Sequence, residues 1–213
     1  VCAEVRNGLA PEHAVGRVIA RPFRGEAPDF KRTNRRRDFA LAPPGHSYLE
    51  AIQSAGVPVH TVGKTGQLMA GVGIDHQHPG ATNAVSLANT GELIETLDHG
   101  MVFTNLVETD QVYGHRHDAP GFAGALQEID RHVARWRPRL GSEDMLILTA
   151  DHGCDVTAPH TDHTREYAPL LALIGPGTTY SRRHDGILAD VGASALDWLT
   201  GQEAPELPGH SFL

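Results

Sequence analysis

The sequence has few cysteines and lacks any long apolar run. Only Cys2 and Cys154 occur among its 213 residues, too few for the disulfide framework of a small secreted domain. No apolar stretch approaches the ~20 residues that a helix needs to cross a bilayer, and no signal peptide is recognisable. Together these absences predict a cytoplasmic protein with no membrane partner.

An excess of positive charge is also lacking. Lys and Arg total 18 against 26 Asp and Glu, which gives a formal net charge of −8. This balance argues against a protein that binds nucleic acid through a basic surface. The exception is a run rich in cations from Lys31 to Arg37. Two interpretations of this run stay open: it attracts a small anionic substrate, or it is a solvated loop.

The most informative stretch begins with the apolar run Met145–Ala150, which is typical of a buried strand in a parallel sheet. Asp151, His152 and Gly153 follow this run directly, and His163 comes eleven residues after His152. In open α/β sheets, ligands bind just beyond the carboxyl ends of the strands. A carboxylate and imidazoles at such a place favour a divalent metal such as Zn²⁺ or Mn²⁺ over a merely exposed polar loop.

A second polar cluster follows another apolar strand, predicted at Met101–Val107. If the two strands are parallel neighbours, five candidate ligands surround one cleft: Asp110, His115, Asp151, His152 and His163. Five ligands exceed the needs of one tetrahedral site, which indicates two metal ions. Two metals clamp the attacking and leaving oxygens of a phosphoryl group, so phosphoryl transfer is the predicted reaction class.

The two clusters resemble motifs of the phosphopentomutase family, within the alkaline phosphatase superfamily: NLVETDQVYGHRHD at residues 105–118 and TADHGCDVTAPHTDHTRE at 149–166. The likeness covers nearly the whole chain, including GRVIARPFRGEAPDFKRTNRRRDFAL from residue 16 and VGKTGQLMAGVGI from residue 62. It implies an isomerase that interconverts ribose 1-phosphate and ribose 5-phosphate, or the deoxyribose forms. A small-molecule sugar phosphate would then be its partner.

The same resemblance implies a cofactor and a nucleophile. The cofactor would be two Mn²⁺ ions, with Zn²⁺ or Mg²⁺ as alternatives, and the nucleophile a phosphorylated threonine. In this sequence Asp110, His115 and His163 would hold one ion. Asp151 and His152 would help to hold the other.

Substrate-binding residues and a domain division are implied as well. Arg17 and Ile19 match positions that contact the sugar phosphate, and Lys64 matches a phosphate-contacting lysine. The ordinary alternatives are a surface salt bridge for Arg17 and a loop lysine for Lys64. Residues 1–38 would be the remnant of a small α/β cap domain, and residues 39–213 the carboxyl-terminal part of the metal-binding core.

Two parts of the family pattern have no match in these residues: an aspartate that binds the second metal and the nucleophilic threonine. The expectation is that this sequence is the carboxyl-terminal portion of a longer chain, with the threonine upstream of Val1, and that it does not complete the reaction alone. A short natural variant is the alternative. Other functions that stay open are a metal-dependent phosphatase, a phosphoglycerate mutase of the same superfamily, and a truncated, non-catalytic metal-binding module.

Strands alternate with helices from residue 39 onward, which predicts an α/β fold with a mostly parallel sheet and helices on both faces. The expected strands are 15–20, 57–62, 101–107, 145–150 and 170–174, and the expected helices are 47–55, 83–98, 118–136 and 187–199. Residues 71–80, with His76 and His78, are expected to form a surface loop, although an HxH pattern can bind metal. Residues 175–185 are expected to be a turn-rich loop and 201–213 a mobile tail.

Overall fold

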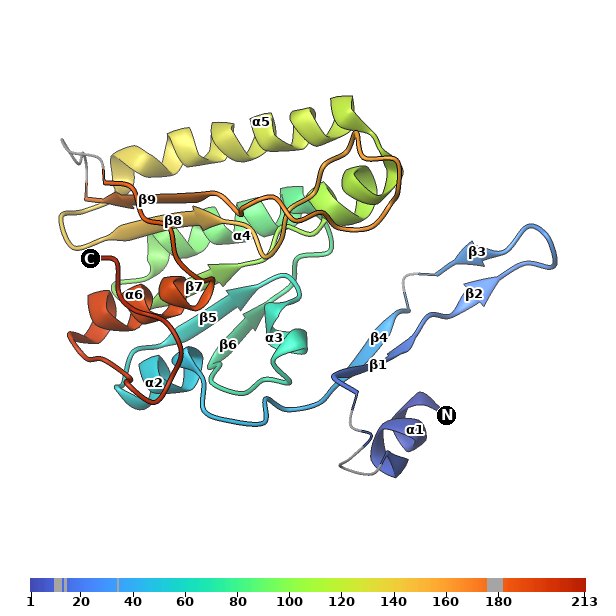
Figure 1. The fold of residues 1–213 in the computed structure, drawn as a ribbon, viewed down its shortest axis with the longest axis horizontal. Helices are drawn as coiled ribbons and strands as arrows, with labels where there is room; N and C mark the ends of the chain where they lie inside the picture. The colour runs from blue at the N-terminus through green and yellow to red at the C-terminus, as the bar shows by residue number, and fades with distance from the viewer. Residues whose placement is uncertain (10–12, 14, 34, 176–181) are drawn as a thin grey trace.

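The computed structural model describes residues 1–9, 13, 15–33, 35–175 and 182–213 (Figure 1). Its centre is a parallel sheet in the order β6–β5–β7, formed by β6 (His76–His78), β5 (Val59–Val62) and β7 (Met101–Thr104). All residues of β5 are buried, as expected for a strand with a neighbour on each side and helices around the sheet. The predicted α/β fold class is confirmed.

A hydrophobic core joins β5 to the two helices at one side of the sheet. These helices are α2 (Tyr48–Ser54) and α6 (Ala189–Thr200), which contact each other. Ile52 of α2 is fully buried, and it packs in one cluster with Val59 of β5 and Leu196 of α6. The predicted apolar faces of both helices therefore form the core.

Polar caps fix where the helices begin. The hydroxyls of Ser47 and Thr82 accept hydrogen bonds from backbone amides at the starts of α2 and α4 (Asn83–Thr96). The carboxylate of Asp118 does the same for α5 (Ala119–Trp136), as its position in the sequence predicts. None of the helices in the described part of the chain has the length and apolar character needed to cross a membrane.

A second sheet contains only β8 (Met145–Thr149) and β9 (Leu170–Ile174), and its strands are antiparallel. The prediction that β8 is a parallel neighbour of β7 is therefore wrong for the described residues, in which β7 pairs only with β5. Side chains that would be buried in a continuous sheet are exposed here, such as Phe103 of β7 (43 %) and Leu171 of β9 (63 %). An apolar run predicts a strand, but it does not encode which strand lies beside it.

An arm of residues 1–40 extends to one side of the core (Figure 1). Its described residues include the helix α1 (Cys2–Gly8) and two antiparallel strand pairs, β1 (Arg17–Ala20) with β4 (Arg37–Ala40) and β2 (Phe23–Arg24) with β3 (Lys31–Arg32). The short helix α3 (Thr65–Leu68), which follows β5, contacts β4 and so joins the arm to the core. The predicted division after residue 38 stays a prediction, and β4 runs across it.

Two predictions about irregular segments are wrong. Residues His76–His78 form strand β6 and not a loop. The carboxyl-terminal tail is docked: Phe212 is 9 % exposed, its amide donates to Ser194 Oγ at 2.9 Å, and the amide of His210 donates to Asp190 Oδ1 at 2.9 Å. Of the predicted loop 175–185, residues 176–181 lie outside the described residues.

Candidate metal centre

Two short helical turns follow β7 and carry the first pair of candidate ligands. Asp110 lies in η2 (Thr109–Tyr113), a π-helical turn, and His115 lies in η3 (Gly114–Arg116). The second turn ends at His117, whose φ of 55° is left-handed. The chain then enters α5, so both ligands are held between the end of a strand and the start of a long helix.

The first of these turns is fastened to α4 by a reciprocal pair of hydrogen bonds. The carboxylate of Glu108 accepts from the amide of Asn83 at 2.6 Å, and the side-chain oxygen of Asn83 accepts from the amide of Glu108 at 3.0 Å. Charged hydrogen bonds at a helix start are among the stronger ones in proteins. This pair of hydrogen bonds, called here the Asn83–Glu108 lock, fixes the backbone two residues before Asp110. Sequence reasoning missed it because its partners are 25 positions apart.

The loop after β8 is closed by an isolated antiparallel bridge between Gly153 and Thr164. The amide of Thr164 donates to the carbonyl of Gly153 at 3.1 Å, and the hydroxyl of Thr164 accepts from the amide of Asp155 at 2.7 Å. Because the bridge joins the two ends of the loop, His163 returns to the neighbourhood of His152. The loop appears in orange at the upper right of Figure 1, beside the turns that follow β7.

The structure brings four of the five predicted ligands together. Asp110 Oδ1 lies 3.3 Å from His163 Nε2 and 3.5 Å from His115 Nε2. The rings of His152 and His163 are stacked with centroids 3.6 Å apart, and ligand atoms of Asp110, His152 and His163 all lie within 4.8 Å of one another. Asp151 is at the margin: its Oδ1 lies 3.5 Å from His152 Nε2, but its side chain is 81 % exposed.

The hydrogen bonds around the cluster leave acceptor atoms facing inward. Nδ1 of His115 lies 2.6 Å from the carbonyl of Thr161, and Nδ1 of His152 lies 3.0 Å from the carbonyl of Gly153. We assign the proton to Nδ1 in both rings, because a carbonyl can only accept. Nε2 of His115 then presents a lone pair to Asp110 Oδ1, a buried oxygen without a hydrogen-bond donor. A cation between these acceptors resolves their repulsion, so the residues fit a metal ion.

A group of cations lies next to this cluster. Lys64 follows the carboxyl end of β5, and its Nζ donates a hydrogen bond to Gln111 Oε1 at 2.8 Å, one residue from Asp110. Burial lowers the pKa of Lys64, and the positive charges of Arg36 and Arg17 lower it further. Gln111 thus connects the predicted phosphate-binding lysine to the metal cluster. Sequence reasoning missed this role of Gln111.

A carboxylate, Asp38, lies among these cations. Arg36 donates two hydrogen bonds to Asp38, at 2.7 and 2.8 Å, and this pairing lowers the pKa of Asp38, with a smaller contribution from the charges of Arg17 and Lys64. Asp38 is the register partner of Ile19 across the β1–β4 pair. The three predicted substrate-binding residues therefore lie in the neighbourhood of Asp38: Ile19 is its register partner, and Arg17 and Lys64 are close enough to affect its pKa.

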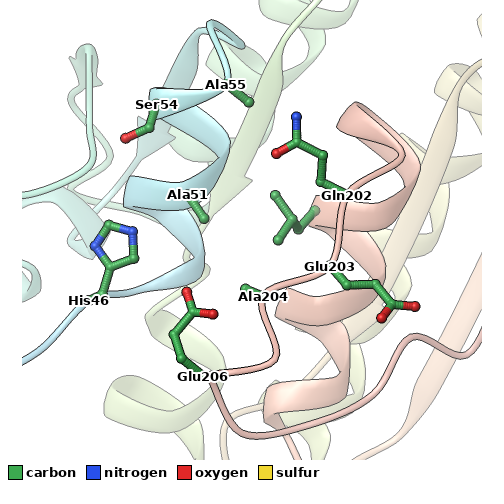
Figure 2. A pocket seen from close by; sticks show the side chains of 9 residues that line it. His46, Ala51, Ser54, Ala55, Gln202, Glu203, Ala204 and Glu206 are labelled. Carbon is green, nitrogen blue, oxygen red and sulfur yellow. The ribbon is translucent and has the colours of Figure 1, made fainter.

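A separate hollow lies between α2 and the segment that follows α6 (Figure 2). It has a volume of about 300 Å³ and is lined by polar side chains that include His46, Ser54, Glu203 and Glu206. In Figure 1, α2 is at the lower left, whereas the loops of the metal cluster are at the upper right. This hollow is therefore not part of the candidate metal centre.

The chain is similar to known proteins in sequence and in structure. The Metalloenzyme superfamily model matches residues 51–202, which include every candidate metal ligand. Among curated proteins, the chain is 49 % identical over 172 residues to a phosphopentomutase of Caldanaerobacter subterraneus subsp. tengcongensis, a match covering 80 % of this chain and 44 % of that protein. It is 44 % identical over 215 residues to a phosphopentomutase of Anaeromyxobacter sp. strain Fw109-5, which covers 100 % of this chain and 54 % of that protein.

The chain spans about half the length of these curated relatives. Among solved structures, a protein of Pyrococcus horikoshii aligns with a TM-score of 0.52 at 18 % identity, over 68 % of this chain and 46 % of that one. Identity this low supports a likeness in fold alone.

Proposed function

Because the chain belongs to the Metalloenzyme superfamily, we propose that it forms the metal-binding part of a phosphopentomutase, which interconverts ribose 1-phosphate and ribose 5-phosphate or their deoxyribose forms. The proposal rests on the convergence of Asp110, His115, His152 and His163 around a buried carboxylate oxygen that has no hydrogen-bond donor. The names of the curated relatives support this reaction over others of the superfamily.

The cofactor in this proposal is a pair of Mn²⁺ ions. Asp110, His115 and His163 hold one ion, and Asp151 and His152 contribute to the other. When bound, the ions supply Lewis-acid stabilisation of the charge on the oxygens of the transferred phosphoryl group. The protein's own contribution is to fix the ligands, and the backbone carbonyls that orient His115 and His152 serve this purpose.

The cations beside the metal cluster bind and orient the sugar phosphate. Arg17 and Lys64 bind the phosphate that does not react, and Ile19 contacts the substrate from the same strand as Arg17. The pairing of Lys64 with Gln111 sets its ammonium next to the metal ligands. Residues 1–38, most of the arm, are the end of a cap domain over this site.

The family's nucleophilic threonine and its further metal-binding aspartate have no match among these 213 residues. We therefore propose that these residues bind metal and sugar phosphate but do not turn over alone, and that activity belongs to the intact protein. The test is an assay of the intact protein with Mn²⁺, ribose 1-phosphate as substrate, and separate detection of ribose 5-phosphate and inorganic phosphate. Ribose 5-phosphate should form without phosphate release, stop forming with a chelator, and form again with added Mn²⁺.

Other outcomes of this assay reject the proposal in favour of a specific alternative. Release of inorganic phosphate without isomerisation identifies a metal-dependent phosphatase. Conversion of phosphoglycerate in place of the pentose identifies another mutase of the superfamily. Binding of Mn²⁺ without turnover of either substrate identifies a non-catalytic metal-binding module.

Replacing Lys64 with glutamine should raise KM for ribose 1-phosphate about tenfold or more, while kcat changes little. A hydrogen bond to a charged group contributes about 1.5–3 kcal/mol, and a contact with the non-reacting phosphate stabilises ground and transition states alike. The measurement is steady-state kinetics of the intact protein. The control is Arg135→Gln, an exposed cation of α5 outside the run Lys31–Arg37, which should leave KM unchanged. Equal KM values for the two variants would remove Lys64 from the substrate site.

A further inference from the structure

A second group of imidazoles lies on the central sheet, away from the candidate metal centre. His60 of β5 is the direct register partner of His76 of β6, in a parallel strand pair. Alternate residues of a strand point to the same face, so His76 and His78 share a face of β6, and Gln77 points to the other. Two strands therefore present three imidazoles side by side at the edge of the sheet, where Figure 1 shows β6 as the outer strand.

The rings of this group are in contact. Nδ1 of His60 lies 3.1 Å from Nε2 of His78, and the two rings are nearly parallel, with centroids 5.3 Å apart. The ring of His76 also lies against His60, with centroids 4.4 Å apart. His60 is 8 % exposed, whereas His76 is exposed. The group is thus buried at His60 and open to solvent at His76.

We propose that His60, His76 and His78 form an additional metal site, which binds a transition-metal ion of the imidazole-preferring class, such as Zn²⁺, Ni²⁺ or Cu²⁺. Two nitrogens bound to Zn²⁺ at about 2.0–2.1 Å in a tetrahedral site are separated by about 3.3 Å. His60 Nδ1 and His78 Nε2 lie 3.1 Å apart in a hydrogen bond. The ion replaces the hydrogen of this bond, and the donor ring then carries its proton on its other nitrogen. The His76 ring directs a nitrogen to the same ion by rotating about its side-chain torsions, and its exposure leaves room for that rotation. Water completes the coordination.

The surroundings of His60 favour its neutral ring, which is the form that metal binding requires. Burial lowers the pKa of His60, and the neighbouring His76 and His78 lower it further, with Asp75 acting in the opposite direction. Both carboxylate oxygens of Asp75 are engaged, by the amide of Val59 at 2.8 Å and by the side chain of Gln53 at 2.8 Å. Asp75 therefore adds negative potential near the rings without being needed as a ligand.

Metal bound here has a structural consequence. β6 has only three residues and one neighbouring strand, so few backbone hydrogen bonds hold it. An ion shared by His60 and the two histidines of β6 joins β6 to the buried strand β5. Such binding stabilises the folded chain, because the unfolded chain does not hold the three rings together.

The test compares the stoichiometry of Zn²⁺ binding, by equilibrium dialysis, in three chains: the unaltered one, H76Q/H78Q, and H99Q as a control in an exposed histidine elsewhere. The unaltered chain and H99Q should bind one more equivalent of Zn²⁺ than H76Q/H78Q, and Zn²⁺ should raise the melting temperature of H76Q/H78Q less than that of the other two. His76→Gln alone changes an exposed side chain, preserves the fold, and should weaken binding at this site at least about tenfold.

Equal stoichiometry in all three chains overturns the proposal, as does an equal loss of affinity in H76Q and H99Q. Mn²⁺ binding at the cluster around Asp110 should be the same in every one of these chains, because none of the substituted residues belongs to it. The result therefore stands apart from the test of phosphopentomutase activity.

Discussion

Replacing Asp110 with asparagine should weaken Mn²⁺ binding at least about 100-fold, because the substitution removes the carboxylate at the centre of the ligand cluster. Oδ1 of Asp110 faces Nε2 of both His115 and His163, at 3.5 and 3.3 Å. Loss of a group that merely orients a ligand costs about 10–100-fold in metal affinity, so loss of the shared charged ligand should exceed that range. Calorimetric titration of the chain with Mn²⁺ measures the effect.

The same substitution should not weaken the fold when metal is absent. Oδ1 of Asp110 is buried and has no hydrogen-bond donor, and an unsatisfied buried acceptor destabilises a fold by about 1–3 kcal/mol. An asparagine amide at that position can donate to the lone pair of His115 Nε2, which lies 3.5 Å from Asp110 Oδ1. We therefore expect the free energy of unfolding of the metal-free chain, measured with urea, to stay equal or to rise by about 1 kcal/mol.

Asp130→Asn is the matched control, since Asp130 is an exposed residue of α5. This variant should bind Mn²⁺ as the unaltered chain does. Equal Mn²⁺ affinity in the Asp110 and Asp130 variants would contradict the assignment of the metal centre. A large loss of stability in metal-free Asp110→Asn would contradict the view that the centre is destabilised until a cation binds.

The ligand residues could be read from the sequence because their signal is local. An apolar run followed at once by Asp151 and His152 predicts a strand end with polar groups, and Asp110 follows β7 in the same way. The contacts that bring the two clusters together could not be predicted from the sequence. The predicted strand pairing is wrong, and the closure comes from the Gly153–Thr164 bridge and from the Asn83–Glu108 lock. Both depend on contacts between residues that are distant in sequence.

The other wrong predictions have a similar cause. The three residues of β6 are too few to show a strand period, and their strand conformation comes from pairing with β5. The tail carries Pro and Gly, which predict irregular backbone, and the backbone is irregular as predicted. Its docking depends on Phe212 entering the core beside α6 and on amide hydrogen bonds to Asp190 and Ser194. Irregular structure and mobility are different properties, and composition predicts only the first.

Replacing Gly153 with alanine should weaken Mn²⁺ binding by more than about tenfold, although no metal-ligand residue is substituted. A Cβ at this position would lie 2.7 Å from the carbonyl oxygen of Thr164 and 2.8 Å from both the amide nitrogen and the carbonyl oxygen of Glu166. These are backbone atoms, so no side chain can rotate away to make room. The bridge between Gly153 and Thr164 must open, and His163, which immediately precedes Thr164, must then move away from His152.

Gly124→Ala is the control for the glycine-to-alanine change itself. Gly124 lies in α5, and a Cβ there would meet no atom within 4 Å. Alanine is favoured over glycine in a helix by up to about 1 kcal/mol, so this variant should be slightly more stable and should bind Mn²⁺ normally. Overpacking at Gly153 should instead lower the free energy of unfolding by about 1–3 kcal/mol. Normal Mn²⁺ affinity in Gly153→Ala would show that the bridge does not position His163. If Mn²⁺ affinity falls although all ligand residues are present, the loss is caused by the changed geometry of the loop. The Asp110 substitution cannot show this, because it removes a charged ligand as well.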